Sequence, residues 1–177
     1  MKVALLGSHP ATKMMAPFGD PEWQIWACSP NNSSIQSPHA SVLPRVDEWF
    51  EVHLPAAHVT RSPEYLAYVR ELTETIPVWM RDRTHHPKAL QYPEAEMKAR
   101  FGPFFFTSSI ALMMAKAIVA RPEVIGLWGI VQASGTEYVN QRPAIQQLMW
   151  EAHKLGIGID MPEQARKTIM AIPREDW

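Results

Sequence analysis

FFFTSSIALMMAKAIVA, residues 104–120, and VIGLWG, residues 124–129, decide the fold of this chain. The pattern predicts a buried strand at 104–106, a hydroxyl-rich helix start at Thr107, Ser108 and Ser109, an apolar helix over 110–119 and a second buried strand. In an open α/β sheet such a junction lies at the carboxyl end of a strand, where backbone N–H groups and the helix dipole favour an anion. The stretch therefore predicts where a phosphate or carboxylate binds.

Outward from this stretch, apolar runs bounded by turn signals predict further strands, and amphipathic runs predict helices between them. The predicted strands are 2–6, 23–28, 47–53, 76–80 and 157–159, and the predicted helices are 63–72, 94–101, 143–155 and 165–170, with a polar excursion over 81–93. Strands that alternate with helices form parallel sheets covered on both faces. We therefore expect an α/β fold, three-layer and Rossmann-like, with a mostly parallel sheet and helices on both faces. One domain is expected over 1–177, with a Pro-rich C-terminal tail from about 160.

Composition favours a small ligand over a nucleic acid. The chain has 177 residues, of which 46% are hydrophobic, and a formal net charge of −1 without a long Lys/Arg run. Non-specific binding to duplex nucleic acid needs clustered positive charge, so such a partner is not expected. Lys116 interrupts the longest apolar run, so no membrane span is expected. The single cysteine and the absence of a signal-peptide pattern indicate a cytoplasmic protein.

The turn after the first strand, GSHPAT at residues 7–12, lacks the second and third glycines of the dinucleotide fingerprint. Binding of NAD or FAD is therefore disfavoured, and no Walker A motif is present either. Two alternatives remain for this turn: it contacts a ligand through Ser8 and Thr12, or it is only a tight connection between strand and helix. The hydroxyl run at 107–109 also has two explanations, since one hydroxyl suffices for an N-cap and the others are spare donors for a ligand.

Candidate catalytic residues come from the third predicted strand. Asp47, Glu51 and His53 alternate and so share one strand face, which a buried strand tolerates only if they are paired or line a pocket. We expect His53 to line the pocket with Glu51, and Asp47 to pair with Arg45. The histidines form no His-x-x-x-His pair, so no metal ligands are assigned, although a divalent metal stays open as a cofactor.

Two further groups of polar residues are candidate ligand contacts. The loop at 29–41 offers Asn31 and Asn32, whose side chains can hydrogen-bond a ligand. Tyr138 and Arg142 precede a helix that begins at Pro143, and the planar guanidinium of Arg142 can clamp a phosphate. The alternative for Arg142 is a pair with Glu137 or a bond to neighbouring carbonyls.

The chain resembles a group of uncharacterised phage and prophage proteins. The resemblance is carried by motifs along most of the chain, among them RVDEWFEVH at 45–53, IPVWM at 76–80, FTSS at 106–109 and GLWG at 126–129. It implies no settled activity, and it implies the host cytoplasm as the location if the chain is phage-encoded.

Residues 105–132 are also similar to the superfamily of bacterial sialyltransferases and hydroxymethylpterin pyrophosphokinase-like enzymes. This second resemblance implies a nucleotide or nucleotide-sugar ligand and a transferase reaction of the glycosyl, nucleotidyl or phospho-transfer type. These families place an Asp where this chain has Val131, so a carboxylate expected there is missing.

Three functions follow as hypotheses. The first is a transferase in which Thr107–Ser109 and Arg142 hold phosphate, the 29–34 loop holds base or sugar, and His53 is the general base. The second is a non-catalytic module that sequesters a nucleotide, which the missing Asp at Val131 favours. The third is a phage structural or assembly protein whose many Pro and Trp residues form a homo-oligomer interface.

Overall fold

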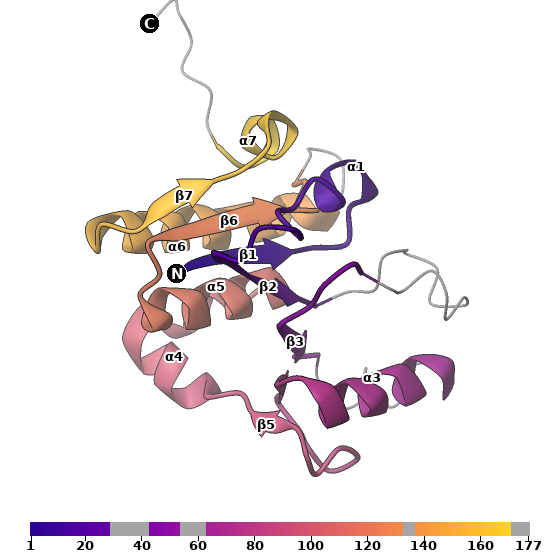
Figure 1. Ribbon diagram of the computed structural model, residues 1–177. Coiled ribbons are helices and arrows are strands. Elements are labelled where there is room, and N and C mark those ends of the chain that lie inside the picture. The colour runs from indigo at the N-terminus through magenta and orange to yellow at the C-terminus, as the bar shows by residue number, and fades with distance from the viewer. Residues whose placement is uncertain (29–42, 54–62, 133–136, 171–177) are drawn as a thin grey trace, which may run out of the picture.

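The computed structural model describes residues 1–28, 43–53, 63–132 and 137–170, whose strands form one seven-stranded sheet (Figure 1). The order is β5-β4-β3-β2-β1-β6-β7, and all neighbouring strands are parallel. The strands are β1 Lys2–Leu6, β2 Trp23–Ala27, β3 Glu48–Glu51, β4 Val78–Met80, β5 Leu90–Gln91, β6 Val124–Trp128 and β7 Gly158–Asp160. The predicted α/β class with a parallel sheet is confirmed.

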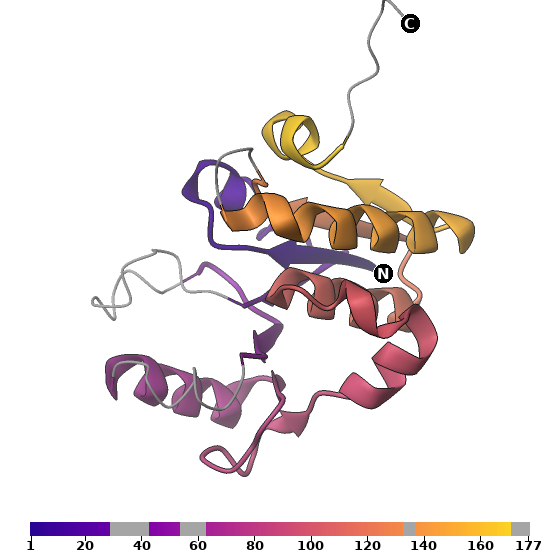
Figure 2. The ribbon, with the colours of Figure 1, turned by 180° about the vertical axis from the view of Figure 1, so that it is seen from behind.

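Helices cover both faces of this sheet, as Figures 1 and 2 show from opposite sides. They are α1 Pro10–Lys13, α3 Pro63–Thr75, α4 Glu94–Phe101, α5 Ser109–Ala120, α6 Arg142–Lys154 and α7 Glu163–Ile169, with short 3-10 helices η2 Pro103–Phe105 and η3 Glu137–Gln141. Because side chains alternate along a strand, Val3 and Leu5 of β1 pack with α5 and α6, whereas Ala4 and Leu6 share the opposite core with α3. The three-layer arrangement is therefore confirmed.

The central strand β1 is the point at which the order of the strands reverses. From β1 the chain builds outward through β2, β3, β4 and β5, then returns through α4 and α5 to place β6 on the other side of β1. In sheets of this kind the loops after two such strands diverge, and ligands bind in the crevice outside their carboxyl ends. The N-termini of α3, α5 and α6 reach the same edge, since each helix leads back to the start of the next strand.

The sequence prediction is wrong for 104–106, which is not a buried strand. Pro103–Phe105 is a 3-10 turn, and the side chain of Phe104 is 82% exposed. Gly102, with a φ of 83°, ends α4, and Pro103 has no N–H to offer a sheet, so the aromatic run only links α4 to α5. The helix start predicted after it is correct, because α5 begins at Ser109.

Two strand boundaries also differ from the prediction. The strand β5 lies inside the segment expected to be a polar excursion, and its two residues are exposed at the edge of the sheet, too short for a periodic signal. The strand β3 ends at Glu51, so His53 lies beyond it, and the shared strand face predicted for Asp47, Glu51 and His53 is not formed.

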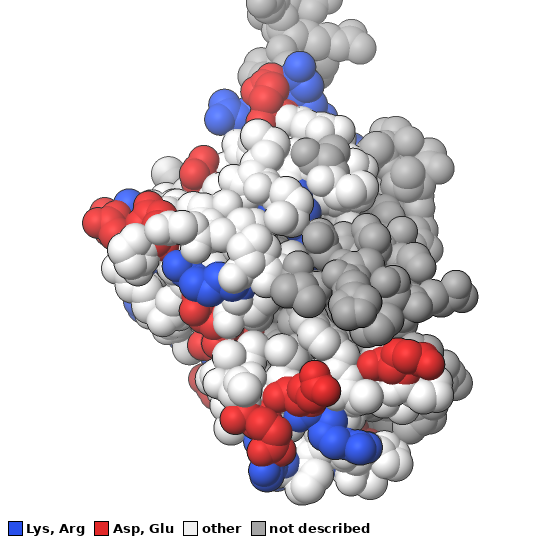
Figure 3. Space-filling model, turned by 45° about the vertical axis from the view of Figure 1, so that its right-hand side comes forward, with Lys and Arg blue, Asp and Glu red and all other residues white. Residues whose placement is uncertain are grey.

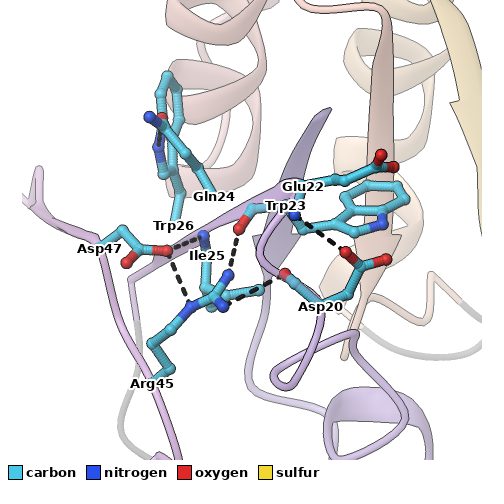
Figure 4. Close-up of polar contacts among 8 residues, drawn as sticks. All are labelled: Asp20, Glu22, Trp23, Gln24, Ile25, Trp26, Arg45 and Asp47. Atoms are coloured by element: carbon cyan, nitrogen blue, oxygen red, sulfur yellow. Dashed lines mark hydrogen bonds and ion pairs between the residues drawn. The ribbon is translucent and has the colours of Figure 1, made fainter. Parts of the chain in front are cut away.

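Arg45 and Asp47 bond each other and backbone groups at and before the start of β2 (Figure 4). The guanidinium of Arg45 donates to Asp47 Oδ2 at 3.2 Å, to the carbonyl of Asp20 at 3.2 Å and to the carbonyl of Trp23. Asp47 Oδ2 also accepts from the backbone N–H of Ile25 at 2.7 Å. The predicted pairing of Asp47 with Arg45 is confirmed, and these contacts tie the segment before β3 to β2.

None of the helices within the described ranges combines the length and the apolar character that a bilayer crossing requires.

Candidate functional site

The turns after β1 and β6 are joined by three hydrogen bonds at the reversal point of the sheet. Gly7 N–H donates to the carbonyl of Trp128 at 2.8 Å, and His9 N–H donates to the carbonyl of Gly129 at 2.8 Å. Gly129 N–H in turn donates to Thr12 Oγ1 at 2.9 Å. A Cβ on Gly7 would lie 2.4 Å from the oxygen of Gly129, so only glycine permits this approach.

These contacts give Thr12 a structural role. Its side chain is buried and its hydroxyl oxygen accepts from Gly129, which is the tight-connection alternative for the 7–12 turn. Ser8 is half-buried at the same turn, as is His9, and Pro10 is exposed. Ligand contact by Ser8 and Thr12 stays a prediction.

The start of α5 lies at the same carboxyl edge. Ser108 is the N-cap, and its Oγ accepts from the N–H of Ala111 at 3.2 Å, so the capping explanation holds for this residue. Thr107 is exposed and Ser109 half-buried, and their hydroxyls have no hydrogen bond to the described part of the chain. The helix start therefore leaves two hydroxyls beside the positive end of an apolar, well-packed helix, as expected for anion contact.

Glu51, His53 and Tyr65 form the most chemically informative group of the site. Glu51 is the last residue of β3 and its side chain is fully buried, which is costly for a carboxylate without partners. Oε1 of Glu51 bonds His53 Nδ1, and Oε2 accepts from the hydroxyl of Tyr65, near the start of α3. The ring of His53 is one-third exposed, with 33% of the side chain accessible. A buried carboxylate thus orients a solvent-accessible imidazole, which is the arrangement of a general base.

Lys13 and Cys28 lie between this group and the β1–β6 turns. Lys13, the last residue of α1, is fully buried, and Cys28 directly follows β2. Burial lowers the pKa of Lys13 to about 8, an effect that the nearby Cys28 partly opposes. Burial also raises the pKa of the Cys28 thiol to about 12, so the thiol is protonated and unreactive at neutral pH.

Arg142 begins α6 at the far side of β6. Its Nη2 donates to the carbonyl of Gln132, which is the alternative in which this arginine bonds a neighbouring carbonyl. Gln132 is buried, and its N–H donates to Thr168 Oγ1 of α7 at 3.1 Å. Within the described part of the chain, Arg142 Nε and Gln132 Oε1 are buried without a hydrogen-bond partner. A ligand role for Arg142 stays a prediction.

The remaining predicted residues fall outside what the structure describes. Asn31 and Asn32 lie in the masked range 29–42, and the side chains of Tyr138 and Glu137 are not described. Over the described ranges no three His, Cys, Asp or Glu side chains gather as a metal ion would need.

Sequence reasoning missed three residues that the fold brings to this edge: Lys13, Tyr65 and Gln132. Tyr65 reads as one member of the apolar face of α3, and its hydroxyl partner is fourteen residues away in sequence. The place of Lys13 next to the turn after the first strand is visible in the sequence. The burial of Lys13 follows only from the fold.

The surface at this side of the molecule has no large patch of one charge among the described residues (Figure 3). That view brings the right-hand side of Figure 1 forward, and its central described part is mostly uncharged, with acidic and basic side chains interspersed toward the lower end.

These features define an α/β protein whose candidate functional site lies at the reversal point of a parallel sheet. No protein-family model and no curated protein matches the chain. Among solved structures, it is similar to the sialyltransferase CstII from Campylobacter jejuni in complex with cytidine-5'-monophosphate (CMP), with a TM-score of 0.60, 14% identity, and coverage of 97% of this chain and 85% of that chain. The monofunctional alpha-2,3-sialyltransferase Cst-I from the same organism gives a TM-score of 0.60 at 12% identity, with coverage of 97% and 79%.

Thiamine pyrophosphokinase from Bacillus subtilis is similar as well, with a TM-score of 0.53 and 11% identity. The chain is covered over 92% of its length in this comparison, but it spans only 60% of the pyrophosphokinase. At these identities the likeness shows the fold. The remote similarity to the sialyltransferase and pyrophosphokinase folds is therefore confirmed at the level of architecture.

Proposed function

We propose that this protein binds a nucleotide or nucleotide-sugar at the carboxyl edge of its sheet and transfers a group from it, with His53 as general base. The observation that carries the proposal is the buried Glu51 carboxylate, which holds His53 on one oxygen and Tyr65 on the other. A carboxylate is rarely buried in a core for stability alone, and a histidine oriented in this way is suited to proton transfer.

The geometry supports a specific division of roles. Because Nδ1 of His53 is bonded to Glu51, Nε2 is the ring atom assigned to accept the proton of an attacking hydroxyl. The new bond forms between that hydroxyl oxygen and the transferred group as the bond to the nucleotide phosphate breaks. The start of α5 supports the departing phosphate through its N–H groups and the hydroxyls of Thr107 and Ser109.

The spacing of the strands fits a ligand that reaches from the end of β1 to His53, which follows β3. β3 is separated from β1 by β2, so the end of β3 lies about 10 Å from the end of β1 at the usual strand spacing. A nucleotide-sugar reaches across such a distance, with phosphate near β1 and the reacting sugar near His53. The 29–34 loop, with Asn31 and Asn32, is proposed to hold base or sugar, and Tyr138 and Arg142 to flank the phosphate.

The comparisons support this class of ligand by analogy of fold. The neighbouring structures include CstII in complex with CMP, which motivates CMP and its sugar conjugates as first probes. A phage or prophage origin rests on the sequence resemblance alone and stays a prediction, as does any divalent metal.

The test is a thermal-shift screen with CMP, UMP, AMP, CMP-sialic acid and UDP-glucose, followed by measurement of free nucleotide released from the sugar conjugate that binds. Selective binding raises the melting temperature by mass action. We expect His53→Gln to lower release roughly 100-fold, because loss of a general base has an effect of this order, while binding stays nearly unchanged. His85→Gln, which changes an exposed histidine in the segment before β5, is the matched control and leaves release unchanged.

Each result decides between the hypotheses. Binding without release supports the sequestering module over the transferase. The absence of any shift across the probes contradicts nucleotide binding and favours a structural or assembly role.

A further inference from the structure

Lys13 is a fully buried lysine that the proposed chemistry does not use. It ends the short helix α1, directly after the turn that leaves β1, and its relative exposure is 0%. Burial of an ammonium group is costly, and replacement of such a group by an apolar side chain of similar size often stabilises a protein. A lysine in this position therefore points to a role other than stability.

The side chain of Lys13 lies across the carboxyl end of β1. At one end, its Cβ would be 3.1 Å from a Cβ placed on Gly129, which follows β6. At the other end, the charged group is near Cys28, which follows β2. Since β1 lies between β2 and β6, the side chain spans the reversal point at which ligands of such sheets bind.

The electrostatic environment of Lys13 favours the arrival of an anion. Burial is the largest influence on this group and lowers its pKa to about 8, so the surroundings disfavour the ammonium form. The group is still mostly protonated at neutral pH. A buried charge is screened less than a surface charge, so its field acts on a phosphate several ångströms away.

We propose that the buried ammonium of Lys13 supplies the positive potential at the carboxyl end of β1 and so selects phosphorylated ligands over uncharged nucleosides. Lys13 is a positioning residue, since it acts through its charge from a buried place beside Gly129 and Cys28. The inference rests on the proposed function and specifies the chemical class of ligand that the site prefers.

The experiment compares calorimetric affinities for CMP and cytidine, and for AMP and adenosine, in the wild type, Lys13→Met and Lys13→Gln. We expect both variants to lose about tenfold or more in affinity for the nucleotide, and to bind the nucleoside as the wild type does. The melting temperature of each variant without ligand is measured as well, so that a change in affinity is separated from a loss of folding. Two neutral variants are used so that a packing fault in one does not decide the result.

Lys116→Met is the matched control. Lys116 is a second poorly exposed lysine, but it pairs with Glu48 at the start of β3 at 3.2 Å and lies over the rings of Trp26 and Trp79, away from the carboxyl edge. Its replacement is expected to leave the ratio of nucleotide to nucleoside affinity unchanged.

Three outcomes overturn the inference, and they are distinguishable. If the Lys13 variants lose affinity for nucleotide and nucleoside equally, Lys13 is only structural. If they keep the wild-type nucleotide affinity, the charge is irrelevant and the proposed function stands without it. If the wild type binds neither nucleotide, the proposed function fails and this inference fails with it.

Discussion

At the residue scale, the carboxylate of Glu51 is bonded on both oxygens, by His53 Nδ1 and by the hydroxyl of Tyr65. Hydrogen bonds to a charged group contribute more to stability than bonds between neutral groups. The same carboxylate therefore stabilises the β3–α3 junction and orients the candidate base. Stability and chemistry are coupled at this residue.

Replacement of Tyr65 by Phe tests this coupling. The variant removes one donor from a buried carboxylate, so we expect the free energy of unfolding to fall by about 2 kcal/mol. Tyr92→Phe is the matched control, because the hydroxyl of Tyr92 donates to the neutral carbonyl of Leu112 at 2.7 Å, and its loss is expected to cost about 1 kcal/mol. Urea denaturation measures both, and equal losses would contradict a stronger contribution of the Tyr65 hydrogen bond than of the Tyr92 hydrogen bond.

At the element scale, the site depends on the close approach of the turns after β1 and β6. This approach requires glycine at Gly7, since an added methyl group meets the backbone oxygen of Gly129, and it requires glycine at Gly129, whose φ is 65°. The bonds among Gly7, His9, Thr12 and Gly129 hold the two turns in register. The same contacts hold the turn that contains Ser8 and the short helix α1 that ends at Lys13.

Gly7→Ala is predicted to destabilise the protein by about 3 kcal/mol, because the new Cβ would lie 2.4 Å from a backbone atom that cannot rotate away. Gly19→Ala is the control, since a Cβ there has nothing within 4 Å, and its effect is expected to be within about 0.5 kcal/mol. Thermal and urea unfolding of both variants measure the difference. If Gly7→Ala left the free energy of unfolding unchanged, the turns after β1 and β6 would not be in close contact.

The helices and strands that could be predicted from the sequence are those with a clear run or periodic pattern of apolar residues. The apolar run of α5, the buried runs of β1, β2 and β6 and the boundaries of α4 follow from local patterns. The 3-10 turn at Pro103–Phe105 could not be predicted in this way. The aromatic residues at 104–106 are as apolar as those of a buried strand, but Gly102 and Pro103 impose a turn. β5 is too short to show a period.

The candidate site was predictable only in part. His53, Glu51 and the helix start at 107–109 stand out by residue type at the ends of predicted elements. Lys13 and Tyr65 gain their importance from burial and from partners distant in sequence, which no local pattern reveals.

At the scale of the whole molecule, one parallel sheet brings distant segments to a single edge. Residues from the turn after β1, the end of β3 and the starts of α3, α5 and α6 meet there, and the reversal of strand order at β1 separates the loops around them. The edge combines an anion-favouring helix start, a buried ammonium and an oriented histidine. This combination favours the proposed binding of a nucleotide at this edge.

Nucleotide binding at this edge is tested by the change in backbone amide NMR shifts as isotope-labelled protein is titrated with CMP. We expect the largest changes on amides of the carboxyl edge, at Ser8, Ser108, Ser109 and Gly129. If the largest changes fall instead on the opposite edge, at Glu123 and Gly158, or if no amide responds, nucleotide binding at the carboxyl edge is contradicted.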